Sequence, residues 1–105
     1  MLEFSTAVTV PADHPCLAGH FPGRPVVPAV LLLELAAEAL RRELGAVGVV
    51  GVPAAKFLQP VLPQQALQLH LRADTGRGRA SFRCEAAGSL VATGELAFAA
   101  ADAAP

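Results

Sequence analysis

The feature that most limits the fold is a single helical segment, residues 28–44, whose first turns carry apolar side chains nearly all round. Pro28 suits the first position of a helix, where the N–H group that proline lacks would have no partner in any case. Arg41 and Arg42 favour the negative end of the helix dipole, and Gly45 marks the stop. Because a helix that is apolar on all sides is typically a buried one, we expect the rest of the chain to wrap around it.

Most of the remaining sequence has the pattern of β-strands. Residues 12–27 are the exception, because three prolines and two glycines predict a long ordered loop there. Apolar and polar residues alternate on both sides of a turn at 74–78, and a second turn follows at Gly88. Gly51, Pro53 and Pro60 predict bulges or edge positions in the strand after the helix. The predicted strands are residues 3–11, 49–61, 66–73, 79–87 and 90–99.

This order of elements predicts an α+β fold in one domain, residues 1–105. An antiparallel sheet of about five strands around one long central helix is the arrangement that buries such a helix.

Composition narrows the classes of function. The net charge is −1 and only 16% of the residues are charged, so the chain has no basic footprint for nucleic acid. No apolar run is long enough to span a membrane, and the first residues lack the pattern of a secretion signal. The two cysteines have no metal or disulfide spacing, which predicts free thiols in a reducing cytoplasm. A hydrophobic content of 53% predicts apolar surface that is buried against another subunit.

Candidate chemistry lies where the loop meets the helix. His20 is followed by Phe21, Pro22 and Gly23, and Glu34 lies 34 − 20 = 14 positions further on, inside an apolar run. A histidine titrates near neutrality, and a carboxyl group in apolar surroundings is a suitable acid, so the pair is typical of acid–base catalysis.

These residues carry a resemblance to a known family. The block from Gly19 to Pro28, followed by Val30 to Glu34, resembles the active-site motif of hotdog-fold 3-hydroxyacyl-acyl-carrier-protein dehydratases, with the same spacing of histidine and acid. The block from Ala55 to Pro63 is similar to the strand that follows the helix in that family. The chain is most similar to the short, stand-alone members linked to aryl polyene or pigment synthesis.

The resemblance implies a hotdog fold and the dehydration of a 3-hydroxyacyl thioester to a trans-2-enoyl thioester. It implies His20 as the base, Glu34 as the acid, the N–H of Ala29 as the donor to the thioester carbonyl, and the carbonyl of Val26, next to the turn at Gly23, as the group that orients the imidazole. The two catalytic side chains would come from opposite subunits of a homodimer or of a higher oligomer of dimers. The partner would be an acyl carrier protein, with the substrate on its phosphopantetheine or on CoA and no further cofactor.

Other residues of the motif have secondary candidate roles. Phe21, Phe57 and Phe82 are candidates for lining an acyl tunnel, with core packing as the alternative for each. Arg24 is the best candidate for docking the carrier. Ala29 stands where the family usually has glycine, and Glu38 where it often has glutamine, so Glu38 either faces the site or pairs with Arg42.

Several alternatives stay open on the sequence. His20 could be an ordinary loop histidine, and Glu34 could belong to a solvated helix stripe that also contains Glu38, Arg41 and Arg42. The chain could be a non-catalytic acyl-binding or heterodimer partner subunit, or a hotdog thioesterase. His14, Cys16 and His20 match no metal signature, so no metal site is predicted. His70 is expected to be exposed.

Overall fold

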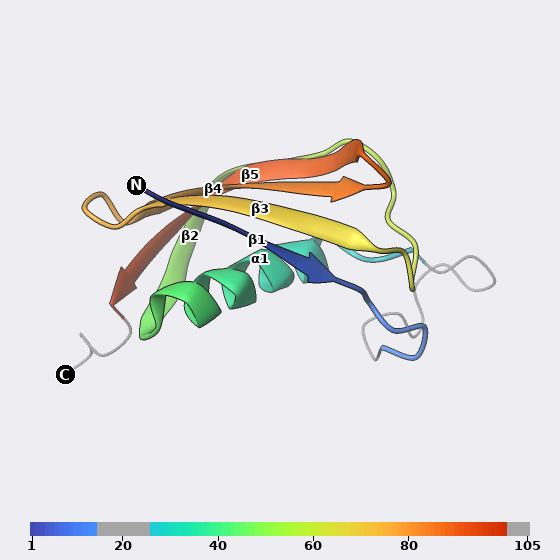
Figure 1. Ribbon diagram of the computed structural model, residues 1–105, viewed down its shortest axis with the longest axis horizontal. Helices are drawn as coiled ribbons and strands as arrows, with labels where there is room; N and C mark the ends of the chain where they lie inside the picture. Colours follow the sequence, from blue (N-terminus) through green and yellow to red (C-terminus); the bar gives the residue numbers. More distant parts are fainter. Residues whose placement is uncertain (15–25, 101–105) are drawn as a thin grey trace.

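The computed structural model describes residues 1–14 and 26–100. Within these ranges, five strands form one antiparallel sheet with the order β1-β3-β4-β5-β2, and one helix, α1, lies across one face of it (Figure 1). The strands are β1 (Leu2–Val8), β2 (Val47–Phe57), β3 (Leu67–Asp74), β4 (Arg79–Ala86) and β5 (Ser89–Ala100), and α1 spans Ala29–Leu44. The predicted order of elements is confirmed.

The helix begins and ends close to the predicted residues. Pro28 has the extended conformation of the residue before the helix (φ −62°, ψ 146°), so Ala29 is the first helical residue. Gly45 ends the helix at φ 84° and its N–H donates to the carbonyl of Arg41, which is the role that glycine commonly takes at a helix C-terminus.

The helix packs on the sheet through one face only. Leu32, Ala36 and Leu40 are buried, whereas Val30 on the opposite face is 58% exposed. The prediction of a helix buried on all sides is therefore wrong for the single chain, because one sheet covers one face of a helix and leaves the other to solvent or to a second subunit.

Strands β3 and β4 alternate as the sequence predicts. Leu67, Leu69 and Leu71 are buried against the helix side of the sheet, and their neighbours Gln68 and Arg72 are exposed. Phe82 and Cys84 of β4 belong to the same core. Phe82 pairs with Gly94 of β5, where an added Cβ would lie 2.7 Å from the phenyl ring and 2.6 Å from the carbonyl oxygen of Ala54.

Strand β2 is irregular and forms one edge of the sheet. Its register with β5 shifts between Val49 and Gly51 and again between Gly51 and Ala54, which confirms the predicted bulges around Gly51 and Pro53. The strand begins two residues before the predicted start and ends at Phe57 rather than at residue 61. Val50 and Val52 on this edge strand are exposed.

Candidate functional site

The start of α1 supplies backbone donors. The N–H groups of Leu31 and Leu32 donate to the carbonyl of Pro28 at 3.0 and 3.4 Å, which leaves the N–H groups of Ala29 and Val30 with no acceptor inside the helix. The positive end of the helix dipole lies at the same place. An oxygen that gains negative charge would be stabilised here.

A depression of about 230 Å³ lies beside these donors. It brings together two residues that the sequence singled out separately, Ala29 and Phe57. Phe57 was predicted either to line an acyl tunnel or to pack in the core. It is 40% exposed, so it does not belong to the core of the single chain. Phe82 is fully buried and does belong to that core. The residues that line the depression are mostly apolar: Val27, Ala29, Leu32, Phe57, Leu58, Gln59, Pro60 and Val61.

Glu34 and Glu38 lie one helical turn apart on the exposed side of α1, but their surroundings differ. Glu38 accepts a hydrogen bond from Arg41 at 2.8 Å and lies 3.4 Å from the Nε of Arg42. The hydrogen bond and the charge of Arg41, with a smaller contribution from Arg42, hold the pKa of Glu38 below its ordinary value. Glu34 forms no ion pair with any residue of the described ranges, 1–14 and 26–100.

Of the two orientations predicted for Glu38, the structure therefore has the one toward arginine. Glu38 lines a groove between α1 and β1 rather than the depression at Phe57. Glu34 and Glu43 are the carboxylates of this helix that have no ion pair among the described residues, and Glu34 is the one nearer the start of the helix.

Four predicted site residues, His20, Phe21, Gly23 and Arg24, lie outside the described residues, as does Cys16. Val26 is described and half-buried. Its neighbour Val27 is buried and donates its N–H to the carbonyl of Val61 at 2.8 Å.

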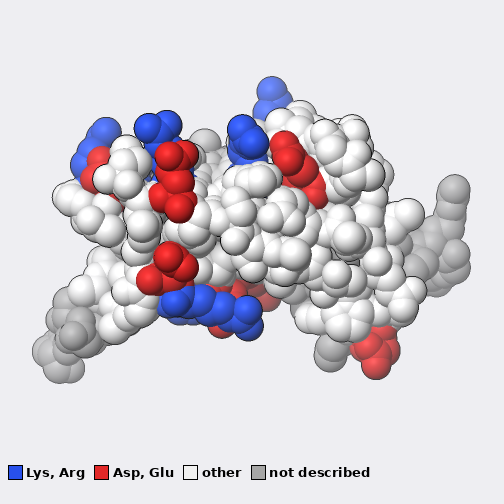
Figure 2. All heavy atoms as spheres, viewed as in Figure 1, with Lys and Arg blue, Asp and Glu red and all other residues white. Residues whose placement is uncertain are grey.

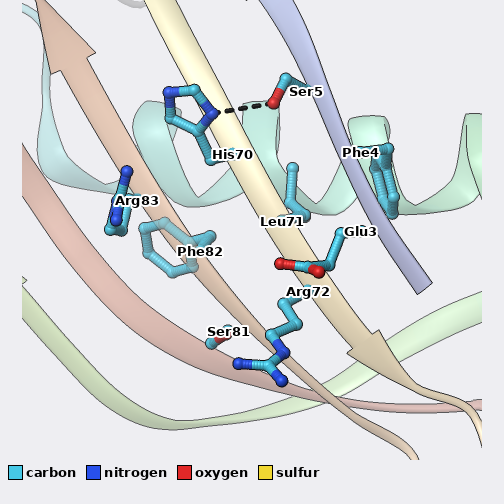
Figure 3. A pocket seen from close by; sticks show the side chains of 9 residues that line it. All are labelled: Glu3, Phe4, Ser5, His70, Leu71, Arg72, Ser81, Phe82 and Arg83. Atoms are coloured by element: carbon cyan, nitrogen blue, oxygen red, sulfur yellow. Dashed lines mark hydrogen bonds between the residues drawn. The ribbon is translucent and has the colours of Figure 1, made fainter. Parts of the chain in front are cut away.

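A second polar cluster lies on the face of the sheet that α1 does not cover. The Nδ1 of His70 in β3 lies 2.8 Å from the Oγ of Ser5 in β1 (Figure 3). On its other side, Nε2 lies 3.1 Å from the Oε1 of Glu85 in β4. Because a carboxylate only accepts, Nε2 carries the hydrogen and the Nδ1 of the neutral ring accepts from the Ser5 hydroxyl. The prediction that His70 is simply exposed is wrong, since its side chain is 34% exposed and has two partners.

This cluster borders a shallow depression of about 440 Å³ on which charges of both signs lie. Glu3 and Arg72 face it together with Ser5, His70 and Arg83 (Figure 3). In the space-filling view, basic and acidic side chains likewise stand side by side over the strands (Figure 2). No pattern in the sequence indicated the cluster, because only the register of β1 with β3 brings Ser5 opposite His70.

The described thiol is not a candidate nucleophile. Cys84 is fully buried in the core, and this burial, with a smaller contribution from the nearby Glu85, raises the pKa of the thiol to about 11. A thiol in such surroundings is almost entirely protonated at neutral pH and is unreactive.

Comparison with known proteins identifies the family of this chain. The sequence matches the family described as ApeI-like, ApeI dehydratase, over residues 2–95. The chain belongs to this dehydratase family. It is an enzyme of the dehydratase class, and the resemblance seen around His20 and Glu34 extends over most of the sequence.

Two relatives share a further name. The chain is 35% identical to a 3-hydroxyacyl-[acyl-carrier-protein] dehydratase FabZ of Herpetosiphon aurantiacus, over 89% of this chain and 74% of the relative. It is 37% identical to the protein of the same name from Chlamydia trachomatis, over 85% of this chain and 67% of the relative.

Solved structures confirm the hotdog fold of this dehydratase. The dehydratase heterocomplex ApeI:P from Xenorhabdus doucetiae contains a chain with a TM-score of 0.84 at 20% identity, matched over 91% of this chain and 86% of that one. An (R)-hydratase from A. caviae has a TM-score of 0.67 at 19% identity, with 92% of each chain matched. Among the described residues, no helix is long and apolar enough to cross a membrane.

Proposed function

We propose that this dehydratase converts 3-hydroxyacyl thioesters, carried on an acyl carrier protein or on CoA, to trans-2-enoyl thioesters. His20 is the base, Glu34 is the acid, and the site is shared between two subunits. The relatives named as 3-hydroxyacyl-[acyl-carrier-protein] dehydratases support the substrate class.

The observation that carries the residue assignment is the contrast between Glu34 and Glu38. A carboxyl group held by two arginines stays ionised and is a poor proton donor, as the lowered pKa of Glu38 indicates. Glu34 has no cation among the described residues and lies one turn after the exposed Val30. A second subunit that covers this face would enclose Glu34 and exclude water from it.

The chemistry balances with proton transfers alone. The imidazole of His20 takes a proton from the carbon beside the thioester carbonyl, and the electron pair of that bond forms the new double bond. The hydroxyl group on the next carbon leaves with its bonding pair, takes a proton from Glu34 and departs as water. General acid–base catalysis of this kind typically contributes about 10²–10⁴-fold for each group.

The start of α1 would stabilise the charge that develops on the thioester oxygen. The N–H of Ala29 is a fixed donor at the positive end of a helix, and one such donor is worth about 10²–10³-fold in comparable sites. The adjoining apolar depression at Phe57 is the proposed place for the acyl chain, with Phe21 extending it and Arg24 meeting the carrier.

A second copy of the chain is the proposed partner. Exposed apolar side chains gather on the edge strand β2 and at the start of α1, where Val50 is 71% and Val30 58% exposed. A long apolar edge strand favours pairing with another chain. The similarity to a heterocomplex of dehydratase subunits makes a different hotdog chain the alternative partner.

The test follows two products from purified protein and a 3-hydroxyacyl thioester. We expect enoyl thioester to form without release of free thiol. H20A and E34Q should each lower kcat at least about 100-fold. E43Q, which changes another exposed glutamate of α1, is the matched control and should keep the wild-type rate.

Each other result points to a different function. Free thiol without enoyl product would identify a thioesterase. Neither product, with the thioester still bound, would identify a non-catalytic binding subunit. Full activity in E34Q would remove Glu34 from the mechanism.

A further inference from the structure

Both ends of the stretch that separates β1 from α1 are fastened to one short turn, residues 61–65. The N–H of Val27 donates to the carbonyl of Val61 at 2.8 Å, just before the helix. The N–H of Gln64 donates to the carbonyl of Val10 at 2.7 Å, just after β1. The two attachment points are therefore only three positions apart in the turn, although Val10 and Val27 are seventeen apart in the sequence.

The turn contains one residue, Gln64, whose backbone conformation is strained. Gln64 has φ 65°, a conformation that favours glycine and is disfavoured for residues with a side chain. Gln65 supports the turn, because its Oε1 accepts from the N–H of Leu62 at 3.2 Å and its own N–H donates to the Leu62 carbonyl at 3.3 Å. Strain of this kind persists where the surroundings impose it and is often found at functional sites.

One other described residue with a side chain has a positive φ, and its cause is local. Ala87 has φ 51° and is followed by Gly88 at φ 81°, in the two-residue turn between β4 and β5. Positive φ at both central residues is what a type I′ hairpin turn needs. Gln64 is in no such hairpin, and its positive φ accompanies the bond from its N–H to the Val10 carbonyl.

The turn also adjoins the proposed site. Val10, Val27 and Val61 are buried at 2%, 4% and 1% exposure, so packing holds the fastened segments in place. Val27 and Val61 line the same depression as Ala29 and Phe57. A shift of the turn would therefore change the position of Val10, where the stretch that contains His20 begins, relative to the start of α1.

We infer that residues 61–65 form a positioning clamp, in which the left-handed backbone of Gln64 fixes both ends of the His20-bearing stretch against the start of α1. The inference rests on the proposed function for the role of His20. It assigns Gln64 as a positioning residue, acting through its backbone rather than through its amide side chain.

The experiment compares three variants in the full chain. Q64V places a β-branched residue at φ 65° and should strain or open the clamp, whereas Q64G keeps the N–H and relieves the strain. A87V introduces the same residue at the other left-handed position, in the β4–β5 turn and outside residues 61–65. The measurements are kcat and KM for the thioester, the melting temperature, and hydrogen exchange at the amide of Val27.

We expect Q64V to lower kcat about 10- to 100-fold, as misplacement of a reacting group by about 1 Å does, with KM changed by less than about threefold. Exchange at the Val27 amide should become faster, although the substitution is at Gln64. Q64G should have the kcat of the wild type and a slower exchange of the Val27 amide than Q64V. A87V should lower the melting temperature but change neither kcat nor the exchange of the Val27 amide. Should Q64V fail to fold, Q65A, which removes the acceptor of the Leu62 N–H, takes its place with smaller effects in the same direction.

Two results would overturn the clamp. One is a kcat and a Val27 exchange rate in Q64V that match those of A87V. The other is a loss in Q64G as large as in Q64V, because the side chain would then be the important group. If the wild-type protein dehydrates no thioester, the proposed function fails. The clamp is then tested by hydrogen exchange alone: faster exchange of the Val27 amide in Q64V than in A87V would support it, and equal exchange would overturn it.

Discussion

Two regions of the molecule differ in how regular their strands and turns are. In the hairpin region, strands β3 to β5, buried and exposed side chains alternate along β3 and β4, tight turns join the strands, and the register shifts once, between Cys84 and Glu85. The helix-start region, which comprises the first turn of α1, strand β2 and residues 58–62, contains bulges and prolines. All residues of β3, β4 and β5 are described, and none of their large apolar side chains is exposed, whereas Val30, Val50, Val52, Phe57, Leu58 and Leu62 of the helix-start region are.

The difference shows that stability and function draw on separate parts of the fold. The hairpin region completes its own core within one chain. The helix-start region leaves apolar surface and backbone donors that a single chain does not satisfy, which is the condition for binding a substrate and a second subunit. Equivalent substitutions in the two regions should therefore have different effects.

The largest difference should be between two phenylalanines. F82A removes a fully buried ring from the hairpin region and should lower the free energy of unfolding by about 3–5 kcal/mol. F57A should lower it much less, because 40% of that residue is already exposed. Urea unfolding of both variants measures this, and equal losses would break the distinction between the regions.

Two glycines give the next comparison. An alanine Cβ at Gly94 would meet the carbonyl of Ala54 and the Phe82 ring, so G94A should destabilise the protein by about 1–3 kcal/mol. Gly48 in β2 has nothing within 4 Å of an added Cβ, so G48A should be neutral or slightly stabilising. Thermal unfolding distinguishes them, and a G94A protein as stable as wild type would contradict the packing described here.

The two edges of the sheet should differ in association. V50S on the β2 edge should weaken the subunit contact by about tenfold in dissociation constant, since burial of part of a valine side chain contributes about 1 kcal/mol or more. L2S on the β1 edge is the control and should leave association unchanged. Analytical ultracentrifugation over a concentration series tests this, and a dimer weakened only by L2S would assign the interface to β1.

The smallest effect should come from the ion pairs on α1. Because Arg41 and Arg42 hold the pKa of Glu38 below its ordinary value of 4.5, the folded state binds this proton less readily than the unfolded chain. The contribution to stability is therefore present above about pH 4.5 and is lost as the pH falls through the folded pKa. Melting temperatures between pH 3 and 7 should fall slightly less steeply in E38Q, and a steeper fall would contradict the ion pairs.

The sequence predicted the regular parts of the fold well and the irregular parts less well. The alternation in β3 and β4 was sufficient because a period of two assigns each side chain to a face. The prediction extended β2 to residue 61, although the strand ends at Phe57. The apolar residues Val61 and Leu62 continue the pattern of a strand, and the pattern does not show that the pairing with β5 has ended before Pro60. Phe57 is exposed because no segment of the described chain covers it, and a local sequence pattern does not show which segments will pack against a residue.

Contacts between distant segments were the hardest to predict. The partners of His70 come from β1 and β4, and Gln64, at a positive φ, is bonded to Val10 far back in the sequence. For the site, the motif around His20 and Glu34 led to the family, and the structure added the distinction between Glu34 and Glu38. The assignment of their catalytic roles remains a prediction.

The pairing of β1 has a consequence for the order in which the chain assembles. Its partner strand β3 lies far along the sequence, with Ser5 and His70 separated by 65 positions. Closing so long a loop is entropically unfavourable until the contacts it makes are numerous, whereas β3, β4 and β5 need only tight turns. We therefore expect the hairpins to form first, and the N-terminal strand to dock on a sheet that is made after it on the ribosome. A chain released before β3 is complete has no place to put its first strand.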